Sequence, residues 1–333
     1  MAVKGSGSSL SFSEIETEFG QNSDRDLGEY RVSQTVGALS NQPLDEGIPQ
    51  GSSPIKFSDF YSKRLNVVID YHSGSTENRP TVAKTRYDAA AGTGTHTVIG
   101  GFRTRPANSG GTKTRIHINK TIGSSNSNVN NCAVRTGTGW NTGTVLTVEI
   151  GSSGALYGAG GDGGEQGNSG GANGENGGTG SSGLGIQYSG TIITNNGSIN
   201  AGYGGGGGGQ GLPGGEGLDG GADGTISAGG NGGNGGSEEQ AHGGGGGGGA
   251  GSSPGEGGEG GNNNDGADGT GTVGGSGASG THTGSIEGEN NVQGAGANGG
   301  GSGAAIRRSS SSIEITYAVS GTINGDISAT GVS

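Results

Sequence analysis

Cysteine, proline and aromatic side chains are all scarce in this chain of 333 residues. A single cysteine, Cys132, excludes an intrachain disulfide framework and any zinc site built from several cysteines. Aromatic residues are 4% and hydrophobic residues 26% of the chain, so one conventional core along the whole length is not expected. No apolar run approaches the roughly 20 residues of a membrane span. The first residues lack the apolar region of a secretory signal, so we expect assembly inside a cell.

Positive charge is missing from half of the chain. Residues 136–306 contain no Lys or Arg, whereas fifteen acids lie between Glu149 and Glu289. Residues 66–135 hold nine Lys or Arg and three acids, a net charge of +6. A phosphate backbone would be repelled by the acidic half, which argues against nucleic-acid binding there.

Glycine occupies 87 positions, about one in four where ordinary usage is roughly 7%. Many glycines recur every third residue, at 161, 164, 167 and 170, and then, after a slip of one, at 171, 174, 177, 180 and 183. Three residues per turn is the period of the polyproline II helix. Collagen would need an unbroken register and abundant proline, so we expect a bundle of glycine helices from one folded-back chain. A flexible glycine linker is the other interpretation.

The remaining segments predict a mainly β protein. Residues 67–69, 112–120 and 144–150 have strand patterns, with weaker candidates at 81–87, 95–103 and 132–136. We expect a small β-sandwich or barrel over 65–150, a glycine-rich bundle over 151–308 and C-terminal capping strands over 309–333. Short isoleucine-bearing segments at 189–194, 197–200, 223–227 and 284–287 are expected to cap the bundle ends.

Residues 1–64 contain an internal repeat, because 10–15 (LSFSEI) aligns with 55–60 (IKFSDF). Each copy predicts one or two helical turns, and Ser13 with Glu16 fits a capping box. A frayed leader with chance similarity is the alternative. A unit of this size is too small to bury its own aromatic residues. We therefore expect it to dock on another protein through Phe12, Phe19, Phe57, Phe60 and Tyr61.

Two resemblances follow from these patterns. Residues 154–303, with slipping Gly-x-x triplets, solid glycine runs and SGTI segments, resemble the glycine-rich region of tail-fibre adhesins of T-even-like phages. The segments SLSFSEIETEF and PIKFSDFYSKR are similar to short N-terminal repeats of phage virion proteins, including those of phages that infect cyanobacteria. The first resemblance implies a polyglycine II bundle with recognition loops at its tip. This chain departs from the adhesins in carrying its own leader and β domain.

Catalytic patterns are not found in the sequence, so we expect no enzyme and no cofactor. The five histidines are scattered, and the glycine runs lack the Lys of a phosphate-binding loop. Calcium is the one metal considered, at Asp219 with Asp223 and at Asp265 with Asp268, but neither stretch fits an EF-hand loop. We expect solvated acidic turns and no metal site.

Receptor contacts are expected on loops between glycine segments, because loops on a rigid scaffold carry recognition. The candidates are Tyr203, Glu238, Glu239, Gln240, His242, Asn262, Asn263, Asn264, Glu287 and Asn290. Tyr203 could stack on a sugar ring, with packing as the alternative, and Trp140 is open to the same two interpretations.

The sequence thus suggests a phage virion protein of the tail or fibre apparatus that acts in host attachment. Its expected partners are other virion proteins, bound through the N-terminal segment, and a host glycan or outer-membrane protein; a homotrimer is an expectation by analogy. The alternative is a capsid, neck or collar decoration protein whose glycine spike has no receptor role. An antifreeze protein is a third hypothesis, but the acidic and polar x positions do not suit an ice-binding face.

Overall fold

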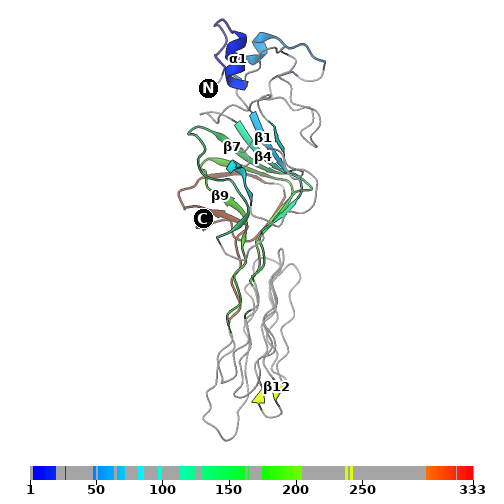
Figure 1. The fold of residues 1–333 in the computed structure, drawn as a ribbon, viewed down its shortest axis with the longest axis vertical. Coiled ribbons are helices and arrows are strands. Elements are labelled where there is room, and N and C mark those ends of the chain that lie inside the picture. The colour runs from blue at the N-terminus through cyan, green and yellow to red at the C-terminus, as the bar shows by residue number, and fades with distance from the viewer. Residues whose placement is uncertain are drawn as a thin grey trace.

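The structure is a computed structural model that is mainly β, as expected. It describes residues 3–19, 27, 48–49, 52–63, 66–71, 81–85, 97–99, 113–124, 130–161, 164, 175–204, 237–238, 241–242, 298–319 and 321–332. Helix α1 (Phe12–Phe19) and the 3-10 turn η3 (Phe57–Phe60) form a small unit at one end, next to three sheets (Figure 1).

The strands are short and lie mostly in three sheets, here named A, B and C. Sheet A has the spatial order β15 (Ile315–Val319), β10 (Thr191–Asn195), β7 (Val145–Ile150), β4 (Lys113–Ile118), β1 (Asn66–Tyr71) and β3 (Thr97–Ile99). Sheet B has the order β16 (Thr322–Asn324), β11 (Ser198–Asn200), β8 (Ala155–Tyr157) and β5 (Thr121–Gly123). Sheet C has the order β17 (Ala329–Thr330), β14 (Ile306–Arg308), β9 (Ser182–Ile186), β6 (Cys132–Arg135) and β2 (Thr81–Val82).

The chain passes through the sheets in a repeating order and so forms a coil of parallel strands. One coil is β4, β5 and β6, and the next is β7, β8 and β9. The third is β10, β11 and β14, and the last is β15, β16 and β17. Neighbouring coils pair in parallel throughout, and among the described strands of these sheets only β3 runs antiparallel, against β1.

This arrangement differs from the sandwich or barrel expected for 65–150. The expected strands are present at each predicted position in that region, from β1 to β7. Strands β4, β5 and β6 instead pair in parallel with β7, β8 and β9, the strands one coil further along the chain. The boundaries expected at 150 and 308 fall within sheets, because β7 pairs with β10 and β14 pairs with β17. The strands at 189–194, 197–200 and 313–325 belong to these sheets, whereas 223–227 and 284–287 lie outside the described residues.

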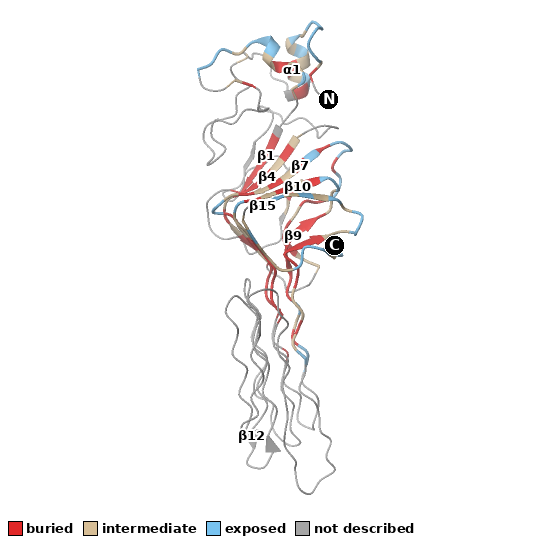
Figure 2. Cartoon of the chain, turned by 180° about the vertical axis from the view of Figure 1, so that it is seen from behind, coloured by how far each residue is buried: buried red, intermediate tan, exposed pale blue. Residues whose placement is uncertain are grey.

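The core consists of aliphatic residues stacked from coil to coil inside the three sheets. In sheet A, Ile116 pairs with Val148, which pairs with Ile193, and all three are fully buried (Figure 2). In sheet B, Leu156 lies between Ile122 and Ile199, also fully buried. Each such side chain contributes about 1.5–3 kcal/mol through removal from water.

The corners between sheets explain where the glycine-rich stretches go. The corner from sheet A to sheet B is tight, and Gly154, Gly197 and Gly321 stack there so closely that a Cβ on one would strike the backbone of the coil before it. The corner from sheet B to sheet C takes the insertions, since residues 158–181 join β8 to β9 and 201–305 join β11 to β14. Both long insertions therefore leave and re-enter the coil at the same corner.

Candidate functional site

Two parts of the molecule lie at opposite ends of the sheets and are candidate sites. The first is the N-terminal unit, formed by residues 3–19 and 52–63. The second is a set of four glycine segments, 158–161, 175–181, 201–204 and 298–305, which leave the sheets on the side away from α1 (Figures 1 and 2).

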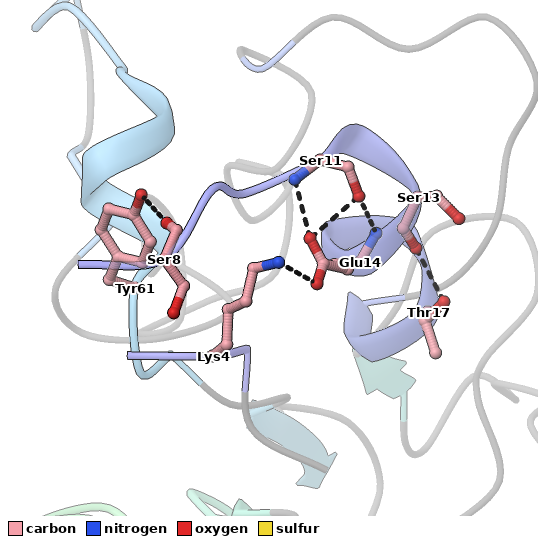
Figure 3. Close-up of polar contacts among 7 residues, drawn as sticks. All are labelled: Lys4, Ser8, Ser11, Ser13, Glu14, Thr17 and Tyr61. Carbon is pink, nitrogen blue, oxygen red and sulfur yellow. Dashed lines mark hydrogen bonds and ion pairs between the residues drawn. The ribbon is translucent and has the colours of Figure 1, made fainter. Parts of the chain in front are cut away.

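Helix α1 begins with a capping box. The Ser11 N–H donates to Glu14 Oε2 (2.8 Å), and the Glu14 N–H donates back to Ser11 Oγ (3.4 Å) (Figure 3). The capping box expected at Ser13 and Glu16 is therefore two residues out of place, because Ser13 lies inside the helix and its carbonyl accepts from the Thr17 hydroxyl. The caps satisfy backbone donors that the helix itself leaves unpaired.

The second repeat copy reproduces this geometry on η3. The Lys56 N–H donates to Asp59 Oδ2 (2.7 Å), as Ser11 does to Glu14. Next to η3, the Tyr61 hydroxyl donates to the Ser8 carbonyl (2.7 Å), which ties the two parts of the unit together (Figure 3).

The two copies also meet through equivalent aromatic residues. Phe12 and Phe57, which hold the same repeat position, pack edge to face with ring centroids 5.3 Å apart. Ile15 and Phe60, at another shared position, are both fully buried. Residues at equivalent positions of the two copies are therefore in contact at one position and equally buried at the other.

The expected docking residues separate into exposed and buried ones. Phe57 is 38% exposed, while Phe12 and Tyr61 are half-buried. Phe60 has no exposed surface and packs in the core. Phe19 ends α1, and its side chain lies outside the described part of the structure.

An ion pair between Lys4 and Glu14 also joins two parts of the N-terminal unit. Lys4 Nζ lies 2.5 Å from Glu14 Oε1. The hydrogen bond from Lys4, followed by those from Ser11, lowers the pKa of Glu14 to about 2. The carboxylate therefore stays ionised over nearly the whole accessible pH range.

The four glycine segments are joined by backbone hydrogen bonds at three-residue intervals. The N–H groups of Gly177, Gly180 and Gly183 donate to the carbonyls of 298, 301 and 304, at 2.9–3.0 Å. In the same way Gly158 and Gly161 donate to the carbonyls of 200 and 203. The segments are also cross-linked by bonds from Ser181 to 159, from Gly202 to 181 and from Gly303 to 202.

At most of these contacts the neighbouring backbone lies too close for any residue other than glycine. A Cβ built on Gly161, Gly180, Gly202, Gly300 or Gly303 would overlap a backbone carbonyl of the neighbouring segment. Gly301 is the contrast, since a Cβ there would meet nothing within 4 Å. The spacing of the crowded glycines therefore matches the spacing of the hydrogen bonds.

The expected receptor contacts are only partly described. Tyr203 is 2% exposed within a glycine segment, and burial raises its pKa, so packing describes it better than sugar stacking does. Glu238 lies in β12 (Ser237–Glu238) and His242 in β13 (Ala241–His242), which pair as a short hairpin drawn at the end opposite α1 (Figure 1). Glu239, Gln240, Asn262, Asn263, Asn264, Glu287 and Asn290 lie outside the described residues.

Trp140 and His117 are both buried and hydrogen-bonded within the sheets. Trp140 is 7% exposed, and its Nε1–H donates to the Thr136 carbonyl (3.2 Å), which fits the packing interpretation. His117 lies on a strand face as expected, and its Nδ1 is 2.6 Å from Asp70 Oδ1 in the neighbouring strand. The sequence gives no signal for this buried pair, because parallel pairing joins residues in separate coils.

The described residues show neither a cluster of metal ligands nor a membrane-spanning helix. There, no group of three His, Cys, Asp or Glu side chains could hold a metal ion, and Asp219, Asp223, Asp265 and Asp268 are outside that part of the chain. No helix in the described ranges is long and apolar enough to span a membrane. In the comparisons with known proteins, no protein-family model, curated protein or solved structure matches the chain.

Proposed function

We propose that this chain is a phage virion protein of the tail or fibre apparatus, which attaches to host cells through loops carried on a polyglycine II bundle. The observation that carries the proposal is the set of glycine segments bonded at three-residue intervals, on the side of the sheets away from the N-terminal unit. A protein with an anchor at one end and a projecting element at the other suits attachment to a particle.

The glycine segments suit a stiff projection. A helix with three residues per turn and glycine on its contact face has no side chains there. Its backbone can therefore hydrogen-bond to more than one neighbouring segment. Segment 175–181 has bonds to segments 158–161, 201–204 and 298–305, so it occupies an inner position. Glycine loses much conformational entropy on folding, and this dense bonding offsets part of that cost.

The N-terminal unit suits docking to a particle. Phe57 packs edge to face against Phe12 and is 38% exposed, so an aromatic ring remains on the surface of the unit. The proposed partner is another virion protein, and the assembled particle is the proposed location.

A binding assay with multivalent display tests the attachment role. Beads that carry many copies of the chain should bind cells of the strain that the particles infect, because weak contacts add up on one surface. The variant Glu238→Ala with His242→Ala should lose most of this binding, since both residues lie in the described hairpin. The matched control, Ser152→Ala with Ser153→Ala, changes an exposed corner of the sheets and should bind as the wild type does.

The binding of the wild-type and variant beads distinguishes an adhesin from a decoration protein. Loss of binding in the hairpin variant alone supports an adhesin. Wild-type beads that bind no cells at all contradict attachment and favour the decoration protein, in which the glycine projection is a spike without a receptor.

A further inference from the structure

One row of side chains on sheet A alternates acid, base and acid. Asp70 of β1 pairs in register with His117 of β4, which pairs with Glu149 of β7. Ile116, next to His117, belongs to the core, so the row lies on the opposite, outer face of the sheet. The side chain of Asp70 is 1% exposed, that of His117 5% and that of Glu149 28%. A histidine is therefore held between two carboxylates on three neighbouring strands (Figure 1).

The two ring nitrogens of His117 have different surroundings. Nδ1 lies 2.6 Å from Asp70 Oδ1, and because a carboxylate can only accept, this nitrogen carries the proton of the ring. Nε2 of the neutral ring is then an acceptor, and it faces another acceptor, Glu149 Oε1, at 3.9 Å. Two acceptors do not bond to each other, so the distance exceeds the length of a hydrogen bond, about 2.7–3.2 Å. A proton on Nε2 would convert this contact into a charge-assisted hydrogen bond.

The charges around the row can also balance one more proton. Arg115, two residues before His117 on the same face of β4, lies 3.2 Å from Glu149 Oε2. One arginine and two carboxylates leave a single negative charge in excess beside a neutral imidazole, and an imidazolium would balance it. Asp70 Oδ2 is buried and has no hydrogen-bond partner among the described residues. A positive ring beside Asp70 would offset part of the cost of burying that oxygen.

The described neighbours at the two ends of the row are uncharged. The row continues with Thr97 of β3 on one side and with Thr194 of β10 on the other. Lys113 is the one further charged residue described on this face of the sheet, and it lies two positions before Arg115 on β4. Histidine is the side chain that ordinarily changes charge between about pH 5 and 8. The row therefore contains one group suited to respond to that range.

We propose that His117 is a proton-operated clamp between strands β1, β4 and β7. At about pH 8 the neutral ring binds Asp70 alone and joins β1 to β4. At about pH 5.5 a proton on Nε2 draws in Glu149, so one side chain joins all three strands. The contact with Glu149 is thus gained as the pH falls and lost as it rises. Strand β1 begins at Asn66, shortly after the N-terminal unit ends at residue 63, so the clamp acts where that unit meets the sheets.

A double-mutant cycle measures the contact between His117 and Glu149 at the two pH values. Trp140, the only tryptophan, is buried and reports the unfolding of the sheets in urea. At about pH 5.5 the coupling between His117→Gln and Glu149→Gln should change the unfolding equilibrium constant about three- to tenfold, because the bond is charge-assisted but partly exposed. At about pH 8 the coupling should nearly vanish. Equal coupling at the two pH values overturns the proposal.

The matched control is the contact of Arg115 with the same glutamate. Arginine stays charged throughout this range, so the coupling between Arg115→Gln and Glu149→Gln should be the same at both pH values. If this coupling changed as much as that of His117, the pH response would belong to Glu149, and the clamp would be contradicted.

NMR of the wild-type chain with isotope-labelled histidine tests the same proton without depending on the folding of a variant. The His117 ring should be protonated at Nδ1 alone at about pH 8 and at both nitrogens at about pH 5.5. A ring whose Nε2 stays unprotonated at the lower pH contradicts the clamp. The clamp does not depend on host attachment, so the two proposals succeed or fail separately.

Discussion

Two neighbouring glycines provide a sharp test of the close packing between the glycine segments 175–181 and 298–305. Gly300→Ala places a methyl group against the carbonyl of Gly178, with the carbonyl carbon 2.5 Å away. Gly301→Ala places the same methyl group in open space. Neither backbone has a left-handed φ, so the two variants differ in the space around the Cβ and in little else.

The magnitude follows from the bonds around Gly300. Relieving the overlap moves segment 298–305 away from 175–181 and weakens the bonds from Gly177 and Gly180, which are 3.0 and 2.9 Å long. Overpacking costs about 1–3 kcal/mol, and each hydrogen bond contributes about 0.5–1.5 kcal/mol, so we expect a loss of about 3 kcal/mol. Gly301→Ala should be neutral or stabilise by about 0.4–1 kcal/mol, because it restricts the unfolded chain.

Amide hydrogen exchange measures this difference residue by residue. In the Gly300→Ala protein the Gly180 amide should exchange about 100-fold faster, since 1.4 kcal/mol is tenfold. In the Gly301→Ala protein its rate should stay close to that of the wild type. Equal effects of the two substitutions would refute the close packing of these segments.

Three further predictions concern the N-terminal unit and the buried thiol. The pKa of Glu14 is lowered to about 2, so its contribution to the stability of α1 is complete above about pH 4.5 and is lost as the pH falls toward 2. The NMR chemical shifts of the α1 residues should change over this pH range. Shifts that are unchanged at pH 2 would contradict the role of the Lys4 ion pair. Ile15→Ala should destabilise the protein by about 2–5 kcal/mol in denaturant unfolding, because Ile15 is fully buried, and a loss below 1 kcal/mol would show a loose core. Burial raises the pKa of Cys132 to about 12, so a thiol reagent should label it only on unfolding, and rapid labelling of the native chain would be inconsistent with this burial.

Local patterns in the sequence predicted much of the local structure. The apolar alternation around Ile116 and Ile118 predicted β4, and the repeat at 10–15 and 55–60 predicted two helical turns. The three-residue glycine spacing matches the positions that hydrogen-bond to a neighbouring segment, such as Gly177 and Gly180. Each of these features depends on residues close in the sequence.

Long-range pairing could not be predicted in the same way. Strand β10 lies between β7 and β15, although about 40 and 120 residues of sequence separate it from them. A short strand such as TIITN has the same pattern whether it caps a bundle or continues a coil, so its sequence predicts a strand but not its place between β7 and β15. The position of the capping box was missed because Ser11 and Ser13 are followed equally by a glutamate three residues later.

Localisation on the particle tests the central claim most directly. Antibodies against residues 151–308 and gold particles would mark the chain on particles purified from cells that produce it. The proposed attachment role predicts gold at the tail or at the fibre ends. Gold on the head or neck would contradict attachment and support a decoration spike, and particles without gold would contradict a virion protein altogether.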